Sequence, residues 1–119
     1  GKYEVYIENG SKRTKIPPVE YAKNMESIGV GEVILNCVDR EGTEKGYDLF
    51  LLERVSEAVN IPVVAVGGAG KLIHFKDAVN KGHASAVAAG NMFVFHGKHK
   101  AVLITYPEYN KLTTLFENK

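Results

Sequence analysis

Three glycines follow a short apolar run near the middle of the chain and form the feature best suited to bind a ligand. The run Val63 to Val66 predicts a buried strand, and Gly67, Gly68 and Gly70 lead from it directly into a helical pattern. Glycines at such a strand-to-helix turn leave backbone N–H groups uncovered, and these groups bind anions, most often phosphate. The alternative is a tight turn that binds nothing.

The residue spacing excludes two familiar nucleotide-binding motifs. A P-loop requires a glycine five positions before Gly70 and a Ser or Thr after its lysine, but Ala65 and Leu72 stand there. The dinucleotide-binding glycine pattern requires a glycine where Ile73 stands. A phosphate site at the C-terminal face of a (β/α)8 barrel remains the best match.

Small residues also follow a second apolar segment, Ser85 to Ala89. Because the C-terminal ends of parallel strands meet at one edge of a sheet, Gly68, Ala89 and Gly90 are expected to offer their N–H groups to one phosphate. Asn91 then begins a short helical turn, whose N-terminus adds positive potential. The pattern predicts an anion site built from backbone donors.

Other polar residues allow further chemistry. Asp39, Glu41 and Asp48 lie in one long loop, where acidic residues either act as a general acid or base or simply face solvent. His96 and His99 have a spacing that suits a metal, but no further ligand joins them in sequence, so a surface or packing role is favoured and no metal is expected. His74 and His83 flank a helix and are expected to face solvent, and Cys37 is expected to be a small core residue.

The elements that position these residues repeat a helix–strand plan. Asn9-Gly10 predicts a hairpin between Tyr3–Ile7 and Lys12–Ile16. Apolar periodicity then predicts helices and strands in alternation, and the nearly continuous apolar strands indicate a parallel sheet. The expected elements are helix 18–28, strand 32–38, helix 51–59, strand 63–66, helix 72–79, strand 85–89, a helical turn 91–95, an extended segment 100–106 and a helix 107–116.

Alternation along the first strand separates two faces. Glu32, Ile34 and Asn36 share one face, and the intervening residues share the other. If helices cover the second face, the first faces the interior of a barrel. Three parallel βα units are an open segment, because a closed barrel takes about 250 residues. The fold class expected is α/β, an incomplete (β/α)8 TIM-barrel segment preceded by a β-hairpin.

Composition narrows the class of protein. The chain has 119 residues, 45% hydrophobic and 24% charged, which suits one domain. A net charge of +1 without a basic run argues against a nucleic-acid surface, and no apolar stretch approaches the length of a membrane span. The single Cys37 and the lack of a signal-peptide pattern favour the cytoplasm. Gly1 in place of a starting Met suggests a longer polypeptide.

Two longer sequence segments resemble a known family. Asp39-Arg-Glu-Gly-Thr-Glu-Lys-Gly-Tyr-Asp48 and Gly67-Gly-Ala-Gly-Lys-Leu-Ile-His-Phe75 resemble the cyclase subunit of imidazole glycerol phosphate synthase, a barrel enzyme of histidine biosynthesis. The resemblance runs from the hairpin to about Phe95. It implies that residues 1–119 are the C-terminal portion of a single (β/α)8 barrel domain, with 1–16 as a hairpin extension.

The resemblance implies a lyase-type reaction that needs no cofactor. In that family a glutaminase partner releases ammonia, which crosses the barrel and reacts with a phosphorylated aminoimidazole carboxamide nucleotide. The implied phosphate and substrate residues are Glu41, Gly42, Gly67, Gly68, Ala89 and Gly90, and the implied ammonia path includes Glu32 and Asn36. The two catalytic aspartates of the family lie on strands outside this chain. It therefore holds no catalytic residue and is expected to be inactive alone.

Several positions depart from the family pattern. This chain has Asn36 where the family usually has Thr, Glu41 where it has Asp, and Val66 and Gly90 where it has Ser. The predicted phosphate site therefore keeps its backbone donors and loses side-chain donors. The tail 93–107 is more similar to a divergent branch associated with surface-polysaccharide sugars. The alternative function is therefore an ammonia-conducting barrel that assists a glutaminase and a sugar amidotransferase. The third candidate function is a phosphate-binding or assembly module without catalytic activity.

Overall fold

The centre of the molecule is a sheet of three parallel strands in the order β3-β4-β5. The computed structural model describes residues 2–8, 10–96, 101–102 and 107–117. Strand β3 spans Val33–Asn36, β4 spans Val63–Val66 and β5 spans Ala86–Val87. Helix α2 (Leu49–Ala58) joins β3 to β4, and α3 (Leu72–Asn80) joins β4 to β5. The parallel βα units expected from the sequence are confirmed.

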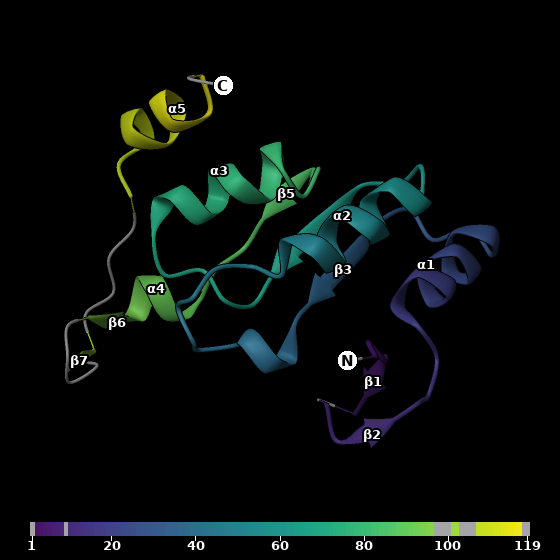
Figure 1. The fold of residues 1–119 in the computed structure, drawn as a ribbon. Coiled ribbons are helices and arrows are strands. Elements are labelled where there is room, and N and C mark those ends of the chain that lie inside the picture. The colour runs from purple at the N-terminus through teal and green to yellow at the C-terminus, as the bar shows by residue number, and fades with distance from the viewer. Residues whose placement is uncertain (1, 9, 97–100, 103–106, 118–119) are drawn as a thin grey trace.

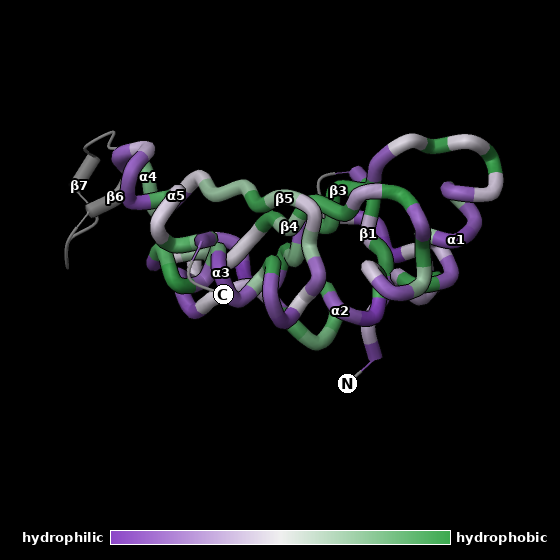
Figure 2. The backbone as a smooth tube through the Cα atoms, turned by 90° about the horizontal axis from the view of Figure 1, so that it is seen from above, coloured by the Kyte–Doolittle hydropathy of each residue, from purple (hydrophilic) through white to green (hydrophobic). Residues whose placement is uncertain are grey.

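Helices α2 and α3 pack against one face of this sheet, and no described helix covers the other face (Figure 2). Leu52, Val55, Val63 and Ala78 are at most 1% exposed and form the centre of the core between α2, α3 and β4. On the opposite face, Ile34 of β3 is 65% exposed, and its in-register partner Val64 of β4 is only half-buried. The alternation expected for the first strand is therefore confirmed, with Val33 and Leu35 turned toward the helices.

An N-terminal hairpin and a helix precede the sheet. Strands β1 (Tyr6–Ile7) and β2 (Lys12–Arg13) pair antiparallel, and a further bond runs from the Val5 amide to the Ile16 carbonyl at 2.9 Å. The hairpin prediction is confirmed; Asn9 of the predicted turn lies outside the described residues. Helix α1 (Pro18–Ser27) begins at a proline and ends before Gly29, whose φ of 99° favours glycine.

The C-terminal elements lie at the end of the molecule opposite α1 and the hairpin (Figure 1). The one-turn helix α4 (Asn91–Val94) follows β5, and β6 (Phe95–His96) pairs antiparallel with β7 (Ala101–Val102). Helix α5 (Tyr109–Glu117) contacts α3. The helical turn and the last helix are confirmed, whereas most of the expected extended segment 100–106 lies outside the described residues.

Strands β3 and β5 are shorter than the sequence pattern predicts, whereas β4 has its predicted bounds. Pro62 has no N–H to donate, and Gly67 leaves the strand with a φ of 90°, so only Val63 to Val66 offer a regular edge to β3 and β5. Glu32 consequently lies just before β3. In the described part of the chain, no helix has the length and apolar character needed to cross a membrane.

Candidate functional site

Three loops meet at the C-terminal edge of the sheet. Residues 37–48, here called the long loop, follow β3 and include a single 3-10 turn, Val38–Arg40. The amide of Gly46 donates to the Gly68 carbonyl at 2.7 Å in the loop after β4. The Asn91 side-chain amide, after β5, donates to Glu44 Oε1 at 2.9 Å. The long loop is therefore hydrogen-bonded to the segments that follow β4 and β5.

The two glycines that end β4 are sterically required. Gly67 and Gly68 have φ values of 90° and 112°, which residues with a Cβ atom rarely adopt. A Cβ atom at Gly67 would lie 2.7 Å from the Cys37 carbonyl oxygen, and one at Gly68 would lie 2.2 Å from the Gly46 carbonyl oxygen. The glycines form the sharp turn that the sequence predicted, and they also allow the long loop to pass directly over the strand exit.

The three amides expected to bind phosphate differ in access. Among the described residues, no acceptor receives a hydrogen bond from the N–H of Gly68, Ala89 or Gly90. Gly68 is buried beneath the long loop, Ala89 is half-buried and Gly90 is exposed. Ala89 and Gly90 are thus the donors that a ligand from solvent reaches first, whereas the Gly68 amide lies deeper.

Glu41, which the family resemblance assigns to the substrate site, lies close enough to Tyr47 for its charge to act on that side chain. Glu41 and Gly42 are both exposed, directly after the 3-10 turn. The pKa of Tyr47 is raised above its ordinary value, first by burial and then by the negative charge of Glu41. Since the Tyr47 hydroxyl donates to the Ala88 carbonyl at 2.8 Å, Glu41 acts electrostatically on a group that contacts the exit of β5.

The two residues expected on an ammonia path lie at opposite ends of β3. Asn36 is exposed at the C-terminal end, with Oδ1 3.0 Å from the position that a Cβ atom would take on Gly67. Glu32 is exposed just before the strand, on the same face as Ile34. Four steps of extended chain lead from Glu32 to Asn36, a distance of about 13 Å. Both lie on the bare face of the sheet.

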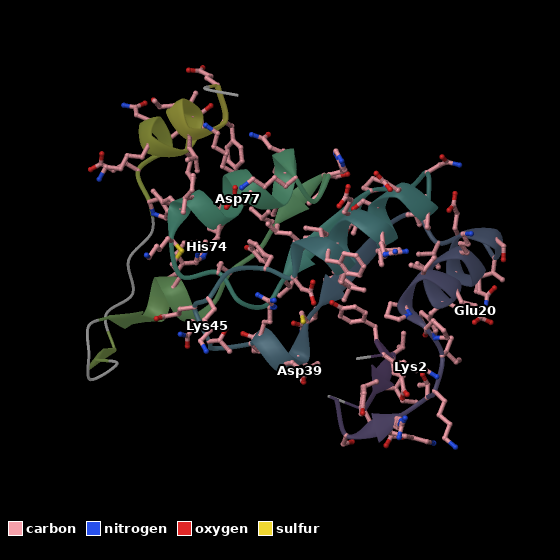
Figure 3. All side chains as sticks on the ribbon, in the orientation of Figure 1. Lys2, Glu20, Asp39, Lys45, His74 and Asp77 are labelled. Atoms are coloured by element: carbon pink, nitrogen blue, oxygen red, sulfur yellow. The ribbon has the colours of Figure 1, made fainter. Side chains whose placement is uncertain are left out.

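The acidic residues of the long loop have different surroundings. Asp48 is the N-cap of α2: it accepts a hydrogen bond from the Leu51 amide at 3.1 Å and another from the Tyr3 hydroxyl at 2.9 Å. Asp39 is exposed on the 3-10 turn (Figure 3). Asp48 therefore has a structural role that explains its position without catalysis.

His74 departs from its expected place in solvent. It is half-buried near the start of α3, and its Nδ1 accepts a hydrogen bond from the Gly70 amide at 3.0 Å (Figure 3). Its ring also lies 3.5 Å from the position of a Cβ atom on Gly46. The expectation for His74 was wrong, because the packing of the long loop against α3 has no local sequence signal.

One group of described side chains has the spacing of metal ligands, away from the strand exits. Glu53 and Glu57 of α2 and His83 place one ligand atom each within 4.8 Å of one another, and all three are exposed. The exposure of His83 agrees with the sequence-based expectation. Glu53 and Glu57 were not singled out from the sequence, although their i, i+4 spacing on a helix is a recognisable signal. His99 lies outside the described residues.

Cys37 lies between the sheet and the long loop. It is half-buried, its amide donates to the Val66 carbonyl at 3.1 Å, and its carbonyl accepts from the Arg40 amide at 3.0 Å. Burial raises the pKa of its thiol, and the charge of Asp48 raises it further. The neutral form of the thiol is therefore favoured, but Cys37 is not part of the buried core, so the expectation of a core residue was wrong.

The geometry defines a class of protein: an open segment of parallel βα units whose ligand-binding loops lie at the C-terminal ends of the strands. The family model described as histidine biosynthesis protein matches residues 1–100. The chain belongs to this family, whose members are TIM barrels.

Known proteins agree with the family. The chain is 49% identical over 112 residues to a Pseudomonas aeruginosa protein provisionally named imidazole glycerol phosphate synthase subunit hisF2, covering 94% of this chain and 45% of that protein. It is 44% identical over 96 residues to imidazole glycerol phosphate synthase subunit HisF of Alkaliphilus metalliredigens, covering 81% of this chain and 38% of that protein. The chain thus spans less than half the length of these relatives.

A solved structure of a FabK mutant from Thermotoga maritima superposes with a TM-score of 0.49 at 26% identity, covering 81% of this chain and 40% of that one.

Proposed function

We propose that this chain is the C-terminal portion of the barrel of an imidazole glycerol phosphate synthase cyclase subunit. The observation that carries the proposal is the meeting of three glycine-bearing loops at one edge of a parallel sheet, in a chain of the histidine biosynthesis family. Its relatives are named as subunits of that synthase. In this proposal residues 1–16 form a hairpin extension of the barrel domain.

The proposed role of the loops is to hold one phosphate of the substrate. Ala89 and Gly90 donate their N–H groups at the surface of the site, and Gly67 and Gly68 form the turn behind them. Glu41 and Gly42 line the mouth of the same site. The substrate is the phosphorylated aminoimidazole carboxamide nucleotide, and backbone amides suit its phosphate because they need no reorganisation on binding.

The proposed ammonia path runs along the bare face of the sheet. Glu32 lies at the entrance end of β3 and Asn36 at the exit end, with the aliphatic Ile34 between them. In this proposal a glutaminase subunit supplies the ammonia, and the reaction takes place in the cytoplasm. The chemical step requires aspartates that the family carries on other strands, so residues 1–119 alone are proposed to be inactive.

The test uses the full-length protein that contains this chain. Isothermal calorimetry compares binding of the phosphorylated aminoimidazole carboxamide nucleotide with binding of inorganic phosphate. A turnover assay with ammonium salt, and then with glutamine plus a glutaminase subunit, measures formation of imidazole glycerol phosphate. The proposal predicts tighter binding of the nucleotide and turnover with both nitrogen sources.

A nucleotide that binds no better than inorganic phosphate would exclude the histidine-pathway substrate. Binding of phosphate without turnover, together with ammonia transfer to a nucleotide-linked sugar in the presence of a sugar amidotransferase, would favour the ammonia-conducting alternative.

A further inference from the structure

The Tyr47 side chain connects the long loop to the exit of β5. Its hydroxyl donates a hydrogen bond to the carbonyl oxygen of Ala88 at 2.8 Å, across 41 residues of sequence. Tyr47 is only 5% exposed and belongs to the buried core. The position of its hydroxyl is therefore set by packing, and the Ala88 carbonyl is tied to a rigid part of the molecule.

The Ala88 carbonyl and the Ala89 N–H belong to the same peptide group. A trans peptide group is planar, and its C=O and N–H bonds point in opposite directions. Fixing the carbonyl of Ala88 against Tyr47 therefore also fixes the direction of the Ala89 N–H. A hydrogen bond to the carbonyl also polarises the group, which makes the N–H a stronger donor.

The other side of this short segment is held as well. The side-chain amide of Asn91 donates to Glu44 Oε1 at 2.9 Å, and Glu44 lies on the same long loop as Tyr47. The segment from Ala88 to Asn91 is thus attached to the long loop at both ends. Between the two attachments lie Ala89 and Gly90, whose amides donate to no acceptor among the described residues.

From this geometry we propose that Tyr47 is a positioning residue, which aims the Ala89 amide at the substrate phosphate through the Ala88 carbonyl. The inference rests on the proposed function, because it takes Ala89 and Gly90 as phosphate donors. Ala88 is exposed, so water can satisfy its carbonyl if the hydroxyl is removed. In this proposal the Tyr47 hydroxyl orients the Ala89 N–H, and it is not required to satisfy the Ala88 carbonyl.

The protonation state of Tyr47 suits this role. Burial and the charge of Glu41 both raise the pKa of Tyr47, so its hydroxyl keeps its proton at neutral pH. It remains a hydrogen-bond donor under the conditions in which the enzyme would work.

The experiment compares Tyr47→Phe with a matched control in the full-length protein. Tyr3→Phe removes a tyrosine hydroxyl that also contacts the long loop, through Asp48 at 2.9 Å, but it leaves Ala88 untouched. NMR titration with inorganic phosphate follows the Ala89 and Gly90 amide resonances. We expect Tyr47→Phe to shift the Ala89 resonance without ligand and to weaken phosphate binding roughly fivefold, the effect of one hydrogen bond. Tyr3→Phe should do neither.

The outcomes separate the two proposals. A parent protein whose Ala89 and Gly90 amides do not respond to phosphate refutes the proposed phosphate site itself. A parent that responds, together with a Tyr47→Phe variant of equal affinity and unchanged Ala89 resonance, overturns the role of Tyr47 alone. A Tyr47→Phe protein that fails to fold also overturns it, since the hydroxyl would then be required by the fold.

Discussion

The amide of Gly46 donates to the carbonyl oxygen of Gly68 at 2.7 Å, and this bond holds the long loop against the exit of β4. The contact is so close that no side chain fits between the two residues. Sequence separates them by more than a helix and a strand, yet the fold joins them at the proposed phosphate site. The bond therefore links the geometry of the site to the stability of the fold.

Replacing Gly68 by Ala should destabilise the protein. The new Cβ atom would lie 2.2 Å from the Gly46 carbonyl oxygen at a φ of 112°. The expected loss in the free energy of unfolding is about 2 to 4 kcal/mol, from backbone strain and overpacking together. Urea denaturation measures it. Gly90→Ala is the matched control, because a Cβ atom at Gly90 meets nothing within 4 Å; its effect should stay within about 0.5 kcal/mol.

Replacing Gly90 by Ser should strengthen phosphate binding. The open space around Gly90 accommodates the side chain, and the family resemblance assigns a serine hydroxyl to the phosphate at this position. One added hydrogen bond predicts a gain of roughly fivefold in affinity. Calorimetry with inorganic phosphate measures it in the full-length protein. Gly90→Ala adds a Cβ atom without a hydroxyl, so an equal gain for both variants would contradict the explanation.

Removing the Asp48 carboxylate should destabilise the start of α2. Asp48→Ala loses the bond from the Leu51 amide and the bond from the Tyr3 hydroxyl. We expect a loss of about 1 to 2 kcal/mol in the free energy of unfolding. Asp48→Asn keeps an acceptor oxygen for the Leu51 amide but replaces the oxygen that accepts from Tyr3 with an NH2 group, so it should lose less than Asp48→Ala. Asp39→Ala, on the exposed 3-10 turn of the same loop, is the control and should be close to neutral; a comparable loss there would refute the capping role.

Cys37 should react slowly with thiol reagents while the protein is folded. Burial raises its pKa above the ordinary 9.0, so less of the thiol is ionised at pH 8 than in the unfolded chain. The neutral thiol is favoured by folding, so its contribution to stability is present below pH 9.0 and is lost as the pH rises through the higher folded-state pKa.

The rate of reaction with Ellman's reagent at pH 8, with and without denaturant, measures this protection of Cys37. Asp48→Asn should speed the reaction of the folded protein slightly, because the Asp48 charge contributes to the raised pKa. Equal rates for folded and unfolded protein would rule out protection by burial.

Sequence predicted those elements whose ends carry a local chemical signal. Strand β4 has the predicted bounds, since Pro62 and Gly67 interrupt its apolar run on either side. Helix α1 begins at Pro18 and ends before Gly29, as the proline and the glycine predicted. Strand β5 is shorter than predicted because only Ala86 and Val87 pair regularly with β4, and the extent of that pairing is not encoded in the local sequence.

The site was predictable only where it consists of backbone. Gly67 and Gly68 appeared as a candidate because their residue type reports an unusual backbone conformation. Tyr47 and His74 did not, because their roles arise from contacts with Ala88 and Gly70 across loops. A tyrosine that bonds a distant carbonyl has the same local sequence as one that faces water.

The bare face of the sheet has a consequence for how the protein associates with other chain segments. Ile34 is 65% exposed, and Ala86 of the edge strand β5 is exposed on the same side. Aliphatic groups beside a strand edge that has no further partner among the described residues favour pairing with another strand. A segment that pairs with this edge and covers this face would remove both surfaces from solvent together.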